Sequence, residues 1–140
     1  TPTDRNEILR KREIRDSLNL QTILKYIKLH GYPEIRLVGR RPAKAFWYVF
    51  IHCGDTIEMQ KGLSVLKDLC RQGEAEWSHF ALLTDKLHVA KKELQEYGTQ
   101  YDLGPDGTGL MRLYPYDNIE AVNERRKKLG MGPIGDPKDN

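Results

Sequence analysis

Apolar residues recur with a helical period along much of the chain. The clearest set has the spacing i, i+3, i+4 and i+7 and consists of Leu20, Ile23, Leu24 and Ile27. This spacing is typical of one face of an amphipathic helix, with Ser17 or Asn19 as its cap and Gly31 at its end. The preceding residues 4–16 are highly charged, so they predict a separate and marginal helix that needs tertiary support.

A continuous apolar run occupies residues 45–51, after a loop that we predict for residues 34–42 around Gly39. The aromatic and β-branched residues of this run favour a strand. A helix that is apolar on every side is instead typical of a buried central helix. Because the flanking segments have helical patterns, we predict a central helix here.

Two further helices are predicted after this run. Asp55 or Thr56 can cap the first of them. Its apolar stripe is Met59, Leu63, Leu66 and Cys70. Gly73 separates it from the second, which is expected to start near Glu74 and to stop near Leu94. The apolar side of the second is Trp77, Phe80, Ala81, Leu83 and Leu87.

Two short runs, residues 97–101 and 110–114, flank a cluster of Gly, Pro and Asp at residues 104–109. This arrangement predicts a β-hairpin with a long tip. Alternation along the first strand would then place Tyr97 and Thr99 on one face and Gln100 on the other.

The last helix is predicted from a cap at Asp117 or Asn118 to Leu129, followed by a loose tail from residue 132 that is rich in Gly, Pro and Asp. These elements predict a mainly α fold, a compact helical domain with a C-terminal β-hairpin. With 140 residues, the chain is expected to form a single domain, residues 1–140, whose core needs no disulfide or metal.

The composition excludes a disordered chain and a membrane-embedded chain. Hydrophobic residues make up 39% and charged residues 31% of the chain, which is typical of a globular domain. The longest apolar run, residues 45–51, is far shorter than the roughly 20 residues of a membrane span, so no contact with a membrane is expected. The sequence leaves two compartments as alternatives: the cytoplasm, or export of the protein followed by removal of a leader.

The net charge of +3 is too small to identify a partner, but its distribution is uneven. Residues 1–50 carry eleven Lys or Arg against five Asp or Glu. No aromatic residue interleaves with the basic cluster at residues 10–15, so a solvated helix face is favoured over nucleic-acid binding. Cys53 and Cys70 lack the spacing of metal ligands, so we expect no metal site. Free thiols are favoured, with a disulfide as the alternative in an exported protein. No cofactor is expected.

His52 and Asp85 are the candidate catalytic residues. His52 ends the most apolar segment of the chain, and burial keeps a histidine neutral and able to act as a base. Asp85 lies within an apolar helical stretch, where a carboxylate needs a partner. That partner can be Lys86, a basic residue elsewhere, or the ring N–H of His52, which Asp85 would orient as in many catalytic sites. The alternative is a purely structural role for both residues.

Residues 95–100 are the candidate ligand-binding segment. Its polar side chains are those of Gln95, Tyr97, Thr99 and Gln100. Such groups suit the recognition of a polar substrate or the stabilisation of an oxyanion, and they equally suit a structural turn. Arg125 or Arg126 can clamp an anion, although residues 125–128 also form the basic C-terminus that a helix favours.

Four short segments follow one another in an order that resembles a known family. They are the Ile51–His52 pair, the Asp85–Lys86 pair, the segment Gln95-Glu96-Tyr97-Gly98-Thr99-Gln100 and the basic helix that ends at Met131. This order is similar to a bacterial domain family of unknown function with a Gln-x-Tyr-Gly-Thr-Gln motif, in which an Arg is usual at the position of Lys86. The resemblance covers residues 16–131 and supports one domain. It marks seven positions for testing: His52, Asp85, Gln95, Tyr97, Thr99, Gln100 and Arg125.

Two functions from different classes are therefore expected. One is a hydrolase or group-transfer enzyme, with His52 as base and residues 95–100 around a polar substrate. The other is a non-catalytic module that binds a small polar ligand or a protein partner, with the motif as internal scaffolding. Geometry discriminates between them, because an enzyme needs the motif side chains to line a concave pocket.

Overall fold

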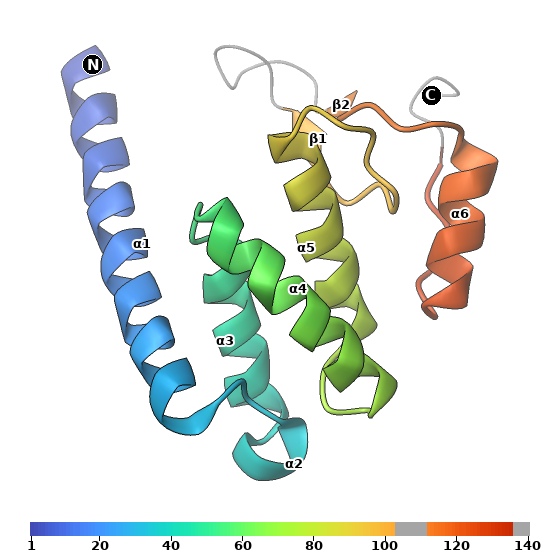
Figure 1. Ribbon diagram of the computed structural model, residues 1–140. Helices are drawn as coiled ribbons and strands as arrows, with labels where there is room; N and C mark the ends of the chain where they lie inside the picture. Colours follow the sequence, from blue (N-terminus) through green and yellow to red (C-terminus); the bar gives the residue numbers. More distant parts are fainter. Residues whose placement is uncertain (103–111, 136–140) are drawn as a thin grey trace.

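The computed structural model describes residues 1–102 and 112–135, and its described part is mainly helical with one small sheet (Figure 1). The helices are α1 Pro2–His30, α2 Ile35–Val38, α3 Arg40–Ile51, α4 Thr56–Arg71, α5 Trp77–Ala90 and α6 Ile119–Lys128. The sheet pairs β1, Tyr101–Asp102, with β2, Arg112–Leu113. The predicted class, a helical domain with a C-terminal hairpin, is confirmed.

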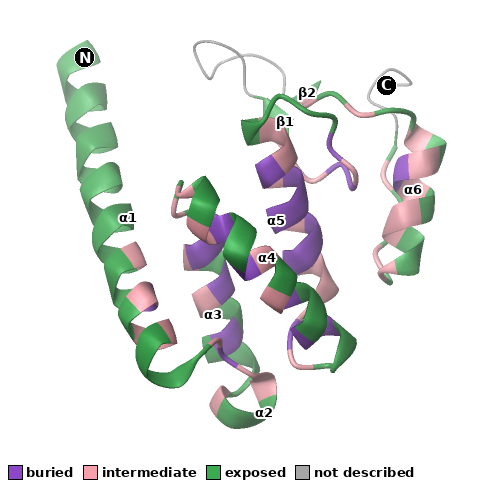
Figure 2. Ribbon diagram, in the orientation of Figure 1, coloured by how far each residue is buried: buried purple, intermediate pink, exposed green. Residues whose placement is uncertain are grey.

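The first helix is longer than the sequence pattern predicted. A single helix α1 replaces the marginal helix over residues 4–16 and the amphipathic helix that was predicted after it. It starts at a capping box, in which the Thr1 hydroxyl accepts from the Asp4 N–H at 3.2 Å. Its first half stands away from the other helices, and no residue before Ile23 is buried (Figure 2).

The prediction of a loop over residues 34–42 was wrong in part. These residues include the single-turn helix α2 and the first residues of α3. Gly39 adopts a φ of +89°, which lets the chain turn between these helices without strain. Pro42 occupies the first turn of α3, where its missing N–H leaves no hydrogen bond unmade.

The core lies where α3, α4 and α5 meet, and these helices carry most of the buried positions (Figure 2). The central helix predicted over residues 45–51 is confirmed as part of α3, although it is not buried on every side, since Tyr48 is 44% exposed. The largest buried side chains of the core are Trp47, Phe50, Met59, Leu66, Leu83 and Leu87. Asp55 caps α4 by accepting from the Glu58 N–H at 3.0 Å, as predicted.

A glycine lets α3 and α4 approach closely. A Cβ at Gly62 would lie less than 3.0 Å from the Phe50 ring, which is fully buried and has no room to shift. We expect Gly62→Ala to lower the free energy of unfolding by about 1–2 kcal/mol, because overpacking outweighs the gain in helix propensity. Urea denaturation of this variant and of the exposed control Ser64→Ala measures the difference. Equal stability of the two variants would contradict the close packing.

The C-terminal part corrects two predictions. The hairpin strands are shorter than predicted, with Tyr101 paired to Leu113 and Asp102 to Arg112, and the predicted tip lies outside the described residues. Residues 132–135 are held against α6 and are not the loose segment that was predicted, because Asn123 accepts from the Ile134 N–H at 2.8 Å and donates to the Ile134 carbonyl at 2.9 Å. Asn118 caps α6 by accepting from the Ala121 N–H at 2.8 Å.

Within residues 1–102 and 112–135, no helix has the length and apolar character that a bilayer crossing requires.

Candidate functional site

Asp85 anchors the predicted motif to α5. Its side chain is fully buried, and its two carboxylate oxygens accept hydrogen bonds from residues 96–99. The donors are the N–H groups of Glu96 at 2.7 Å, Tyr97 at 3.0 Å and Thr99 at 3.0 Å, and the Thr99 hydroxyl at 2.8 Å. A carboxylate that receives this many hydrogen bonds holds the loop in place and has little capacity left for a ligand.

Gln95 closes the same segment from its other side and is 1% exposed. Its amide nitrogen donates to the Gln100 carbonyl at 3.1 Å and to the Tyr114 carbonyl at 2.8 Å. Its amide oxygen accepts from the Gln100 N–H at 3.0 Å. Gln95 therefore ties residues 95–100 into a closed turn and joins that turn to the segment after β2.

The remaining motif side chains are also engaged within the protein. Tyr97 is buried against Phe80, with ring centroids 6.2 Å apart, and burial raises the pKa of its phenol. The Gln100 side chain donates to the Thr99 hydroxyl at 3.2 Å. Residues 97–100 do not form the predicted strand, because the N–H groups of Tyr97 and Thr99 both turn toward Asp85.

Two arginines of α6 hold the motif from the side opposite α5. Arg125 donates to the Glu96 carbonyl at 3.1 Å and pairs with Asp117, whose pKa this hydrogen bond lowers to about 2. Arg126 donates to the Tyr97 carbonyl at 2.8 Å and to the Gly132 carbonyl at 2.6 Å. Both arginines that the sequence pattern singled out are thus engaged within the chain, Arg125 with a carboxylate and a carbonyl and Arg126 with two carbonyls.

His52 lies elsewhere, at the C-terminal end of α3. Its Nδ1 is 3.1 Å from the Nζ of Lys86, which follows Asp85 on α5. Neighbouring residues of a helix point about 100° apart, so Lys86 faces α3 while Asp85 faces the motif. The predicted pairing of Asp85 with His52 is not among the hydrogen bonds of either residue.

The Lys86 contact favours one tautomer of His52. An ammonium group can only donate, so the Nδ1 that receives its hydrogen bond holds a lone pair. A neutral imidazole then has its proton on Nε2. Partial burial lowers the pKa of His52, and the charge of Lys86 lowers it further. In this state Nε2 is a hydrogen-bond donor.

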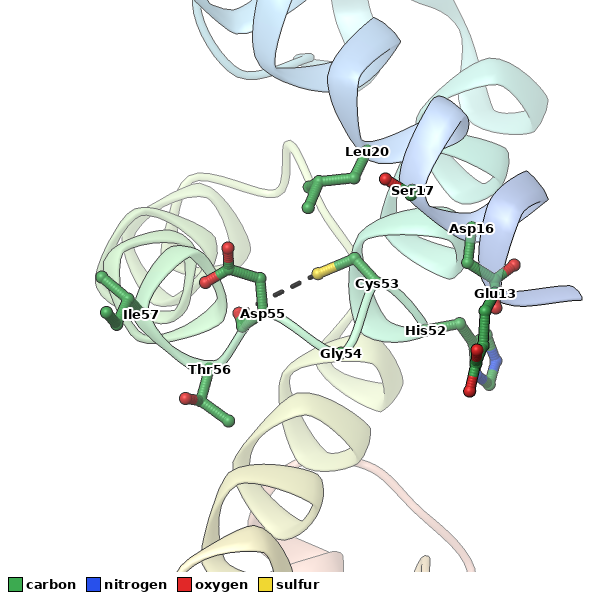
Figure 3. Close-up of a pocket in the computed structure, with 10 residues that line it drawn as sticks. All are labelled: Glu13, Asp16, Ser17, Leu20, His52, Cys53, Gly54, Asp55, Thr56 and Ile57. Carbon is green, nitrogen blue, oxygen red and sulfur yellow. Dashed lines mark hydrogen bonds between the residues drawn. The ribbon is translucent and has the colours of Figure 1, made fainter. Parts of the chain in front are cut away.

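Two hollows lie between the middle of α1 and the end of α3, and both include Asp16 and His52. The first, of about 470 Å³, we call the basic hollow. Its lining is Arg12, Arg15, Asp16, Asn19, Tyr48, Val49 and His52. The second, of about 610 Å³, we call the acidic hollow (Figure 3). Its lining is Glu13, Asp16, Ser17, Leu20, His52, Cys53, Gly54, Asp55, Thr56 and Ile57.

Of the seven residues that the sequence marked, His52 lines these hollows, whereas the other six are absent from the lining of both. Sequence reasoning missed the contribution of α1, although Arg12 and Arg15 belong to the basic cluster that it assigned to a solvated face. Neither arginine forms an ion pair with the described part of the chain. Cys53 and Cys70 are free thiols, and no group of three potential metal ligands occurs in the described ranges.

Comparison with known proteins identifies the family of the chain. Neither the curated proteins nor the solved structures contain a match to it. One family model matches residues 4–137, which is nearly the whole sequence and includes α1, the hollows and the motif. The chain therefore belongs to a family of unknown function, DUF6624.

Proposed function

We propose that this chain is a non-catalytic binding module that takes the anionic group of a polar ligand into the basic hollow. The observation that carries the proposal is the 3.1 Å contact between Lys86 Nζ and His52 Nδ1. This contact directs the Nε2–H of His52 to act as a donor. A donor of this kind suits a carboxylate, a phosphate or a carbonyl oxygen.

The enzyme hypothesis receives less support from the same geometry. A general base of the His–Asp type needs a carboxylate on the ring nitrogen that does not react. His52 has a cation at that position, and its lowered pKa weakens it as a proton acceptor at neutral pH. The motif side chains, which would have bound the substrate, are hydrogen-bonded into the loop between α5 and α6.

Arg12 and Arg15 supply the positive charge of the basic hollow. They are one helical turn apart on α1, so their guanidinium groups can converge on the same anion. Asn19 and Tyr48 add uncharged donors at the wall of the hollow. The basic hollow has a volume within the range of small-molecule sites.

A nuclear magnetic resonance experiment tests the proposal with inorganic phosphate and acetate as probes. At pH 7 the ring nitrogens of His52 are expected to show the Nε2–H tautomer, and Lys86→Met should remove this preference. Addition of either anion should shift the signals of His52 and Tyr48. The Arg12→Ala/Arg15→Ala variant should bind the anions about fivefold more weakly, because two charge-assisted contacts are lost.

The control is Lys25→Ala/Lys28→Ala, which removes the same charge from the same helix at positions that line neither hollow. Equal weakening by both double variants would show attraction by net charge and would contradict a site. Absence of shifts at His52 would contradict it as well. Hydrolysis of an ester or phosphoester that is lost in His52→Gln would support the enzyme hypothesis instead.

A further inference from the structure

The two hollows carry opposite charge although they share Asp16 and His52. The basic hollow has two arginines against one carboxylate. The acidic hollow has three carboxylates, those of Glu13, Asp16 and Asp55, and no Lys or Arg in its lining. A ligand that reaches through both hollows therefore meets a positive surface at one end and a negative surface at the other.

The geometry of α1 produces this separation. Arg12 and Arg15 lie on one side of the helix, whereas Glu13 is turned by about 100° from Arg12 and lies on the other side. Asp16 falls between the two sides and faces the body of the protein, where its charge acts on both His52 and Lys86. Figure 3 shows Glu13, Asp16 and Ser17 descending from α1 toward the end of α3.

The carboxylates of the acidic hollow differ in what they can offer a ligand. Asp55 already accepts the Glu58 N–H as the cap of α4. Glu13 is exposed and forms no ion pair with residues 1–102 or 112–135. The hydroxyls of Ser17 and Thr56 lie in the same lining. Glu13 is therefore the carboxylate best placed to accept a cationic group of a ligand.

We propose that the ligand is dipolar, namely a peptide segment with an acidic and a basic side chain a few residues apart. This inference rests on the proposed function, because it uses the same anion site. The acidic side chain enters the basic hollow and the basic side chain meets Glu13 and Asp16. The Nε2–H of His52, between the two, donates to a peptide carbonyl.

The charges and sizes of the hollows favour this ligand class over others. Hollows of about 470 and 610 Å³ together exceed the size of a single amino acid, whereas a short peptide spans both. A nucleic acid or an anionic lipid surface presents phosphates throughout, and the three carboxylates of the acidic hollow would repel it. Opposite charges at fixed positions also define the direction in which the peptide lies.

Three blocked peptides of equal length test the inference by fluorescence anisotropy at low salt. One carries glutamates at one end and lysines at the other, one carries only the glutamates, and one carries only the lysines. The dipolar peptide should bind about tenfold more tightly than either of the others, and its affinity should fall with added salt. Equal affinity of the dipolar and the acidic peptide would overturn the inference while leaving the anion site intact.

A charge reversal in α1 locates the cationic end of the peptide. Glu13→Lys should weaken the dipolar peptide about tenfold and should strengthen the acidic peptide. Glu7→Lys is the matched control, because Glu7 is exposed on the same helix and lines neither hollow. Identical effects of the two reversals would overturn the dipolar site. If none of the peptides and none of the small anions binds, the proposed function itself fails.

Discussion

Replacing Asp85 by alanine is expected to lower the free energy of unfolding by about 3–5 kcal/mol, the largest effect of any single change considered for this protein. The substitution removes the acceptor of three backbone N–H groups and of the Thr99 hydroxyl. Because Tyr97 is buried and the Asp85 site is closed to solvent, water does not replace the lost acceptor. The released donors then carry an uncompensated desolvation penalty.

Urea denaturation followed by circular dichroism measures this loss. Asp85→Asn keeps one amide oxygen as an acceptor, so it should lose less stability than Asp85→Ala and remains measurable if the alanine variant does not fold. Asp68→Ala is the control, since Asp68 is exposed on α4 and makes only an i,i+3 pair with Arg71. That control should change stability by less than about 1 kcal/mol. An Asp85→Ala variant as stable as the control would show that the carboxylate does not anchor the loop.

Replacing Gly98 by alanine is expected to lower the free energy of unfolding by about 2–4 kcal/mol, through two separate effects. Gly98 has a φ of +64°, a left-handed conformation that a residue with a Cβ adopts only with strain. Its added Cβ would also come closer than 3.0 Å to Ile134 and within 3.3 Å of Val122. Alanine would therefore separate the motif from α6 and from the segment that follows it.

Gly130→Ala separates these two effects. Gly130 has a φ of +73°, and nothing lies within 4 Å of a Cβ placed there. Its replacement should show the conformational cost alone, roughly 1–2 kcal/mol. Gly98→Ala should lower the free energy of unfolding by more than Gly130→Ala does. This difference should be smaller when Ile134 is also replaced by alanine, which a double-mutant cycle measures. An equal loss at both glycines would contradict the packing of residue 134 over the motif.

The polar residues 95–100 form a structural junction in this protein. Residues 95–100 connect α5, the segment after β2 and α6 through hydrogen bonds to Asp85, Gln95, Arg125 and Arg126. The segment therefore joins α5 to α6 and to the residues after β2 by hydrogen bonds. Polar groups of residues 95–100 are therefore used in the hydrogen bonds of this junction.

Local sequence pattern determined the helical architecture of this protein. The apolar spacing on either side of Gly73 predicted α4 and α5. The caps Asp55 and Asn118 were each one of two neighbouring candidates in the sequence. The pattern also identified Asp85 as a buried carboxylate in need of partners. Such features depend on helical period and capping, which act between residues a few positions apart.

Only the tertiary structure decided which partners the polar residues have. Asp85 and Lys86 are adjacent in sequence, yet one binds the motif and the other binds His52. Arg12 and Arg15 belong to a stretch that is exposed throughout, and they become part of a hollow because α1 lies beside the end of α3. The local sequence determines on which side of a helix a charged residue lies. Which other segment faces that side depends on packing between residues far apart in the sequence, and the pattern of a single chain carries no signal for it.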